Sequence, residues 1–166
     1  MRNMATIRGK RRNWWLRLFG RDERGGALVE LALTVPILGV LLVGASEFAT
    51  LEYDSIEVTN AARAGVAYGS QSTTTAADLT GMQTAATNDG SNVAGLQATA
   101  IEFWSCSKAP AVQYSSASAA ATACPVGYHV LNYVQVNTTV TVTPSIAVPG
   151  LPASYTMTGV AVMRVQ

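Results

Sequence analysis

Nineteen consecutive residues, 27–45, are apolar except for Glu30 and Thr34. As a helix with a rise of ~1.5 Å per residue, this run is about 28 Å long, close to the ~30 Å thickness of the hydrocarbon core of a bilayer. Pro36 would break a soluble helix, because it leaves the carbonyl of Ala32 without its backbone donor. Transmembrane helices tolerate that defect when neighbouring helices pack against it. The run therefore predicts a single membrane crossing with a kink at Pro36.

The charge of the chain is divided unevenly on either side of the junction that precedes this run. Residues 1–25 hold eight of the eleven basic residues and two acids, a net +6, whereas residues 26–166 carry −5. Basic residues interleaved with Trp14, Trp15 and Phe19 could bind nucleic acid or anionic lipid. Their position next to the apolar run favours lipid, because the positive-inside rule then explains them without a further partner. We expect a cytoplasmic N-terminus, a periplasmic C-terminal part and no nucleic-acid partner.

The helical pattern continues beyond the membrane run. Residues 46–69 contain no proline, and acidic residues occupy the faces that the apolar ones leave free. The apolar residues that recur near a 3.5-residue period are Phe48, Leu51, Val58, Ala62 and Val66. This pattern predicts one long helix over about 27–68, first apolar and then amphipathic. Residues 70–75 (SQSTTT) break the pattern, and 76–88 predict a short second helix that ends at Asn88-Asp89-Gly90.

The hydrophobic period changes to two after residue 97, which indicates strands. Thr99, Ile101 and Phe103 alternate with their neighbours, and 155–165 form a last strand after a turn with Pro144, Pro149-Gly150 and Pro152. In the middle strand Val130, Val134, Val136, Val140 and Val142 share one face, opposite Gln135, Asn137, Thr139 and Thr141. The low-complexity stretch 114–123 (YSSASAAATA) predicts a surface loop. The fold class is α+β: a long N-terminal helix, a short helix and a small antiparallel sheet.

Cys106 and Cys124 are the two cysteines, both beyond the apolar run. Neither has a second cysteine or a histidine at a spacing typical of metal ligands. One crossing from a cytoplasmic N-terminus would place both thiols in the periplasm, where pairing is favoured. A bridge would enclose the 17 residues 107–123 and contribute roughly 3 kcal/mol by chain-entropy arguments. Two unpaired thiols in the core are the alternative.

Residues able to carry out catalysis are sparse. His129 is the single histidine, and its place in a strand pattern favours a structural imidazole. Asp78, Asp89 and Glu102 are scattered, and the chain has no glycine-rich phosphate loop or nucleophile elbow. From the sequence we therefore expect that the chain is not an enzyme and that it has no catalytic residue, no metal site and no cofactor.

The junction Arg24-Gly25-Gly26 leaves three interpretations open. Residues 1–45 form a secretory signal cut after Val43-Gly44-Ala45, or the run is an uncut anchor, or a peptidase cuts between Gly25 and Gly26 and leaves the apolar helix on the mature protein. Glu30 favours the third. An acidic side chain in the membrane costs on the order of 2.5–3.5 kcal/mol, less near the interface, and a signal or a bare anchor has no use for it. A Glu30 that reaches interfacial water is the simpler alternative.

Cutting after Gly25 gives Glu30 a partner. Gly26 becomes a free α-amine and Glu30 the fifth residue of the mature chain. The carboxylate can then meet the ammonium of a neighbouring subunit, so that two buried charges offset each other and fix the stagger between helices.

The stretch RGGALVELAL, the mid-membrane Pro36 and NAARAGVAYG at 60–69 resemble the TadE-like minor pseudopilins of the tight-adherence (Flp/Tad) branch of type IV pilus machinery. The resemblance is strong over residues 21–69 and general over the sheet. Type IV pilins combine a glycine-terminated leader, a glutamate at position five and a long helix, which map to Gly25, Gly26 and Glu30. Leu31 departs from the family, where an aromatic commonly follows the glutamate, so the subtype, TadE or TadF, stays open.

The resemblance implies a pilin-like fold and three parts: a cytoplasmic leader (1–25), a transmembrane and periplasmic helix (26–69) and a periplasmic α+β domain (70–166). It also implies partners: a prepilin peptidase, other pilins and pseudopilins, an inner-membrane assembly platform and membrane lipid. The mature protein would wait in the bacterial inner membrane as a single-pass protein and then join or assist a pilus for surface adherence, which would carry it outside the cell. The alternative from another class is an unprocessed single-span anchor that carries a periplasmic binding module or adhesin.

Overall fold

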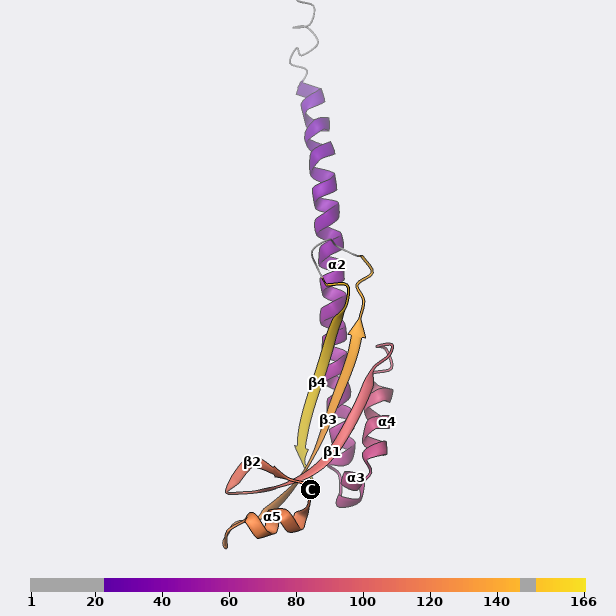
Figure 1. Ribbon diagram of the computed structural model, residues 1–166. Coiled ribbons are helices and arrows are strands. Elements are labelled where there is room, and N and C mark those ends of the chain that lie inside the picture. The colour runs from indigo at the N-terminus through magenta and orange to yellow at the C-terminus, as the bar shows by residue number, and fades with distance from the viewer. Residues whose placement is uncertain (1–22, 147–151) are drawn as a thin grey trace, which may run out of the picture. The chain divides into compact units, whose positions relative to one another are not determined.

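The computed structural model describes residues 23–146 and 152–166 (Figure 1). It confirms the α+β class: a long apolar N-terminal helix, shorter helices and a four-stranded antiparallel sheet in the order β2-β1-β3-β4. The chain divides into two compact units between Gly44 and Ala45. The aromatic residues of the basic arm and the predicted turn at Pro149-Gly150 lie outside the described residues.

Helix α2 (Glu23–Gly69) is the long helix that the sequence predicts over about 27–68. Of the five apolar residues predicted to share its inner face, Val58, Ala62 and Val66 are buried. Leu51 is only partly buried, and Phe48 is exposed. The prediction was wrong for Phe48, because the buried contacts of this face begin near Val58, where α2 meets the sheet.

The short helix predicted over 76–88 is in fact two helices, α3 (Thr73–Ala77) and α4 (Leu79–Asp89). Ser72 and Thr75 form a capping box that starts α3 inside the stretch expected to be irregular. Asp78 ends α3 with a non-helical backbone, and its side chain caps α4 by accepting the Gly81 N–H at 2.8 Å. The predicted helix is therefore divided at Asp78, whose side chain accepts a hydrogen bond from the backbone N–H three residues later.

Three long strands form most of the sheet: β1 (Gln97–Cys106), β3 (Val130–Val142) and β4 (Tyr155–Arg164), as Figure 1 shows. Ala100 pairs with Val136, which pairs with Ala161 on its other side, so these three side chains share a face. That face packs against α2 and α4 in a cluster with Val66, Met82 and Ala86. A second cluster joins Val58, Val93 and Val140.

The face of β1 that enters this core is not the one expected from its alternation. Ala98 and Ala100 pack with the valines of β3, whereas Thr99 and Ile101 are exposed on the other face. Phe103 lies on that other face too, where it is buried and stacks on Tyr133 with ring centroids 5.4 Å apart. The prediction assigned the larger apolar residues of β1 to the core, but the register with β3 decides which face of β1 is covered.

The stretch predicted as a surface loop at 114–123 contains α5 (Ala117–Ala123). Ser116 caps it by accepting the Ala119 N–H, and the alanines that made the stretch look low in complexity are the strongest helix formers. Strand β2 (Ala109–Tyr114), which was not predicted, precedes this helix and pairs with β1 at the edge of the sheet. Pro110 is compatible with that edge position.

Asp78 also links α4 to α2, because the Tyr68 hydroxyl donates to its second oxygen at 2.8 Å. The backbone N–H of Gly81 and the Tyr68 hydroxyl hold the pKa of Asp78 below its ordinary value. The same hydrogen bond raises the pKa of Tyr68. Both bonds favour the ionised carboxylate, so their stabilising effect is present above the unfolded pKa of about 3.9 and is lost as the pH falls through the folded pKa.

We predict that Asp78→Ala lowers the Tm of the chain in detergent micelles at pH 7, since it removes both bonds. The difference from the unsubstituted protein should shrink as the pH falls below about 4, where the wild-type carboxylate is itself protonated. Asp89→Ala, at the other end of α4, is the control and should change the Tm less. Circular dichroism melts from pH 7 to pH 2.5 measure this, and a pH-independent difference would contradict it.

Candidate functional site

The first half of α2 exposes its apolar side chains over its whole surface. From Leu28 to Val43 the large aliphatic residues are all more than two-fifths exposed, and Val40 reaches 74%. Exposure of so large a contiguous apolar surface to water is unfavourable and marks a site of contact with a membrane or another protein. Within the described residues, α2 is the one helix long and apolar enough to cross a membrane. Pro36 lies inside this helix, which continues on both sides of it, and the kink predicted there stays a prediction.

Gly25 and Gly26 lie in the first turn of α2 and are exposed. A Cβ added to either would meet nothing within 4 Å, and neither has a positive φ. Glycine in a helix is destabilising by roughly 1 kcal/mol relative to alanine. The packing and backbone of the described residues therefore give no reason for two glycines at this point.

Glu30 is exposed on α2, one turn beyond these glycines. Its backbone carbonyl accepts a hydrogen bond from the Thr34 hydroxyl at 2.7 Å, so the one polar side chain nearby bonds the backbone. Within residues 23–146 and 152–166, Glu30 takes part in no ion pair. Gly25, Gly26 and Glu30 thus lie within two turns of one another on the exposed part of α2, as their spacing in the sequence predicts.

The second half of α2 approaches the sheet through small residues of the stretch NAARAGVAYG. Ala61, Ala62, Gly65 and Gly69 are buried there. A Cβ on Gly65 would lie 2.9 Å from the Met82 carbonyl oxygen and about 3.0 Å from Val136. These glycines, unlike Gly25 and Gly26, have a packing reason, because a larger residue would push α4 and β3 away from the helix.

A side-chain bond to the helix backbone strengthens this contact. The Thr138 hydroxyl, buried in the middle of β3, donates to the Val58 carbonyl of α2 at 2.7 Å. Gly159 of β4 lies beside it, where a Cβ would come 2.5 Å from that same carbonyl oxygen. The polar residue in an otherwise apolar row is therefore satisfied, and it fixes the register of the helix on the sheet.

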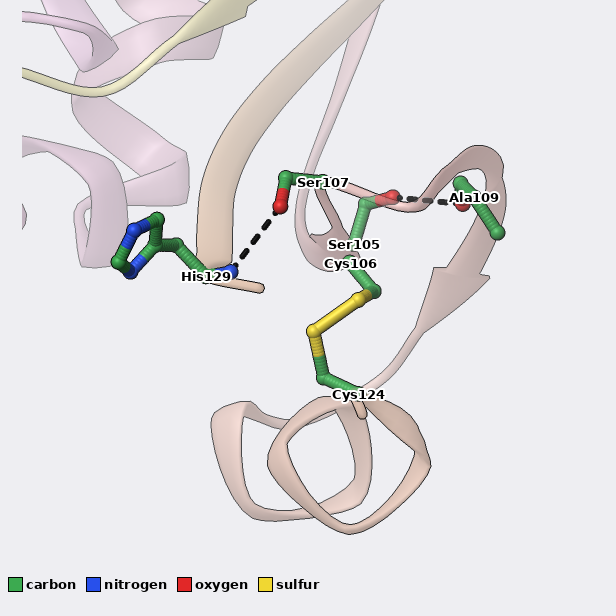
Figure 2. Close-up of a disulfide and its surroundings, with 6 residues drawn as sticks. All are labelled: Ser105, Cys106, Ser107, Ala109, Cys124 and His129. Atoms are coloured by element: carbon green, nitrogen blue, oxygen red, sulfur yellow. Dashed lines mark hydrogen bonds between the residues drawn. A yellow bond between two sulfur atoms is a disulfide. The ribbon is translucent and has the colours of Figure 1, made fainter. Parts of the chain in front are cut away.

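Cys106 and Cys124 form a disulfide bond, with Cα atoms 5.4 Å apart (Figure 2). The bond joins the end of β1 to the residue that follows α5. Of the two alternatives that the sequence left open, the structure has the bridge and no free cysteine.

His129 is not in a strand, contrary to the sequence interpretation. It precedes β3 and is exposed, and its imidazole points away from the disulfide in Figure 2. Its backbone N–H donates to the Ser107 hydroxyl at 3.0 Å, and its carbonyl accepts from the Ser107 N–H at 2.9 Å. Its structural role is therefore that of its backbone. Among the described residues, no group of three or more His, Cys, Asp or Glu could hold a metal ion.

Comparison with known proteins gives one match. The family model described as TadE, TadE-like protein, matches residues 25–67, about a quarter of the chain. The matched segment begins at Gly25, covers the apolar half of α2 and extends to the small residues that contact the sheet. This confirms the family resemblance drawn from the sequence. No curated protein and no solved structure matches.

The contact at Gly65 generates a prediction about stability. Gly65→Val should lower the free energy of unfolding by about 2–3 kcal/mol, because the new side chain overlaps the Met82 carbonyl and Val136. Ala67→Val puts the same side chain on the exposed face of the same helix and should change it by less than about 0.5 kcal/mol. Urea unfolding in detergent micelles measures both. Equal effects of the two substitutions would show that the close approach of helix and sheet does not matter.

Proposed function

We propose, from the premise that this chain is a TadE-like protein of the tight-adherence system, that it is a minor pilin or pseudopilin matured by a prepilin peptidase. The family is one of pilus-associated structural proteins, and membership implies other pilus components as partners. Cleavage falls between Gly25 and Gly26, on the cytoplasmic side of the membrane. The mature helix stays in the inner membrane and later packs into, or helps to assemble, a pilus for surface adherence.

The observation that carries this proposal is the contrast between the glycines of α2. Gly65 and Gly69 are required by contacts inside the chain, whereas a Cβ added at Gly25 or Gly26 would meet nothing within 4 Å, as at Gly39 and Gly44. Gly25 and Gly26 differ from those two in being adjacent and in lying between the basic leader and the apolar run. An exposed glycine pair without a role in the packing of the chain supports recognition of Gly25 and Gly26 by a second protein. A peptidase cleft that closes around the backbone needs small residues on both sides of the cut, since a side chain there would hold the backbone away from the catalytic groups.

Glu30 supports the assembly step. It is exposed on an apolar helix surface, which is costly in lipid unless the carboxylate finds a partner. Cleavage creates that partner, because Gly26 of a neighbouring subunit becomes an ammonium group. Two charges that pair in a low-dielectric environment also fix the axial stagger of the helices that carry them.

The location follows from the same segments. The apolar half of α2, the one candidate span among the described residues, anchors the chain in the membrane. The basic leader, residues 1–25, stays in the cytoplasm by the positive-inside rule, residues 26–69 cross the membrane and continue into the periplasm, and residues 70–166 form a periplasmic domain. The disulfide fits that location, since structural disulfides persist in oxidising compartments. Lipid, the assembly platform and other pilins are the partners of the anchored form.

We predict that Gly25→Leu blocks maturation without preventing insertion into the membrane. Gly39→Leu is the matched control, because a Cβ at Gly39 also meets nothing within 4 Å, and this variant should be cut normally. N-terminal sequencing and intact mass of the membrane-bound chain give the readout: Gly26 first in the wild type and the control, Met1 in Gly25→Leu. A wild-type chain that begins at Met1 would indicate an uncut anchor with a periplasmic binding module or adhesin, and one that begins at Ser46 a secreted protein.

We predict that Glu30→Ala is cleaved normally and enters pili at least about tenfold less efficiently, because removing one partner leaves the other charge buried and unpaired. Glu30→Gln, which keeps the shape and loses the charge, should behave alike. Glu52→Ala, on an exposed part of the same helix beyond the apolar run, should assemble normally. The ratio of mature protein in sheared pili to that in membranes is the measurement. Undiminished incorporation of Glu30→Ala would rule out the pairing.

A further inference from the structure

The residues 107–128, which we call the cystine segment, bury one apolar side chain completely, Ala120, and contribute none to the two hydrophobic clusters. Both buried apolar clusters are formed by side chains of α2–α4, the strands β1, β3 and β4, and the residues next to them. Within the cystine segment Ala120 is buried, and Tyr114, Ser116 and Cys124 are partly buried. Every other residue of the segment is exposed, and Val126 fully so. Burial of apolar surface therefore contributes little to its order, although α5 lies against β1 and β3.

The hydrogen bonds that attach the cystine segment to the sheet and its flanking residues involve its first part, residues 107–114. Strand β2 pairs with β1 at Trp104↔Tyr114 and Cys106↔Ala109, with an irregularity between them. The Ser105 hydroxyl donates to the Ala109 carbonyl at 3.2 Å, and the other bonds join Ser107 to His129 (Figure 2). None of these reaches α5. The bond from Cys106 to Cys124 ties the far end of that helix back to the sheet.

We propose that the Cys106–Cys124 bond is a switch for local order: oxidised, it holds the cystine segment folded, and reduced, it lets the segment unfold while the helix–sheet core persists. The loop that it closes is 17 residues long, enough for cross-linking to favour the closed state by roughly a hundredfold. The other attachments of the segment are the pairing of β2 with β1, the contacts of α5 with β1 and β3, and the one fully buried side chain, Ala120. The side chains whose presentation the switch controls include Val112, Tyr128 and Lys108, whose ammonium lies 5.6 Å from the Tyr128 ring.

The redox step is an ordinary exchange with a dithiol. A thiolate of the dithiol attacks the sulfur of Cys124, the more exposed of the two cysteines, which breaks the bond to Cys106 and releases the Cys106 thiolate. The second thiol of the reagent then closes its own disulfide and releases Cys124. Two electrons and two protons pass from the dithiol to the two cysteines. In a chain that folds while it enters an oxidising compartment, the core can form first and the cystine segment becomes ordered when the bond closes.

Hydrogen exchange of the full chain in detergent micelles, read by mass spectrometry, tests the switch. We expect 5 mM dithiothreitol, or the double variant Cys106→Ser/Cys124→Ser without reductant, to raise exchange in peptides of α5 and β2 roughly a hundredfold. Peptides of α4 and β3 should change less than about twofold. The readout requires no pilus and no processing, so it is independent of the proposed function.

The matched control is Ser116→Ala with the disulfide intact, which removes the cap that Ser116 gives to α5. Its effect should be confined to the first turn of α5 and stay within about tenfold. Two results would overturn the proposal: a cystine segment that keeps its protection after complete reduction, and a loss of protection in α4 and β3 together with it. The second result, in the reduced wild type as in the double variant, would make the bond a requirement of the whole fold.

Discussion

Close packing between a helix and a sheet depends here on side chains that are absent. Gly65 and Gly69 bring α2 near Met82 and the valines of β3, and Gly159 leaves room for the Val58 carbonyl. The Thr138 hydroxyl then donates to that carbonyl, so that the buried hydroxyl is not left without a hydrogen-bond partner in the core. Larger residues at these points would separate the layers, and the buried rows of β3 would lose their contacts with α2 and α4.

The same helix provides for two surroundings with two kinds of surface. Its first half offers aliphatic side chains in every direction, which suits lipid or the helices of other subunits. Its second half offers alanine and glycine to the sheet and polar residues to water. The glycines of the two halves therefore differ in their surroundings: Gly65 is explained by its contacts with Met82 and Val136, whereas no contact within the described residues explains Gly25.

Much of the fold could be predicted because its signals are local. The long helix and the three long strands were predicted from periodicity in 27–68, 99–103, 130–142 and 155–165, and the sheet was expected to be antiparallel, but its strand order was not predicted. The cap at Asp78 had a signal in the sequence, an acidic residue three positions before a helical N–H, and was overlooked. The pairing of Thr138 with Val58 spans 80 residues and leaves no local pattern. The covered face of β1 depends on its register with β3. Small residues such as Ala98 and Ala100 give only a weak signal for that register in the sequence.

The site residues divide in the same way. Gly25, Gly26 and Glu30 are apparent in the sequence because their types conflict with an exposed apolar helix, whereas their use depends on molecules outside the chain. Tension applied along α2 is passed to the centre of β3 by the Thr138–Val58 bond and the surrounding small-residue packing, well before the loop after Gly69 is loaded. Such tension would strain β3, an inner strand of the sheet, before the disulfide-bound end of β1.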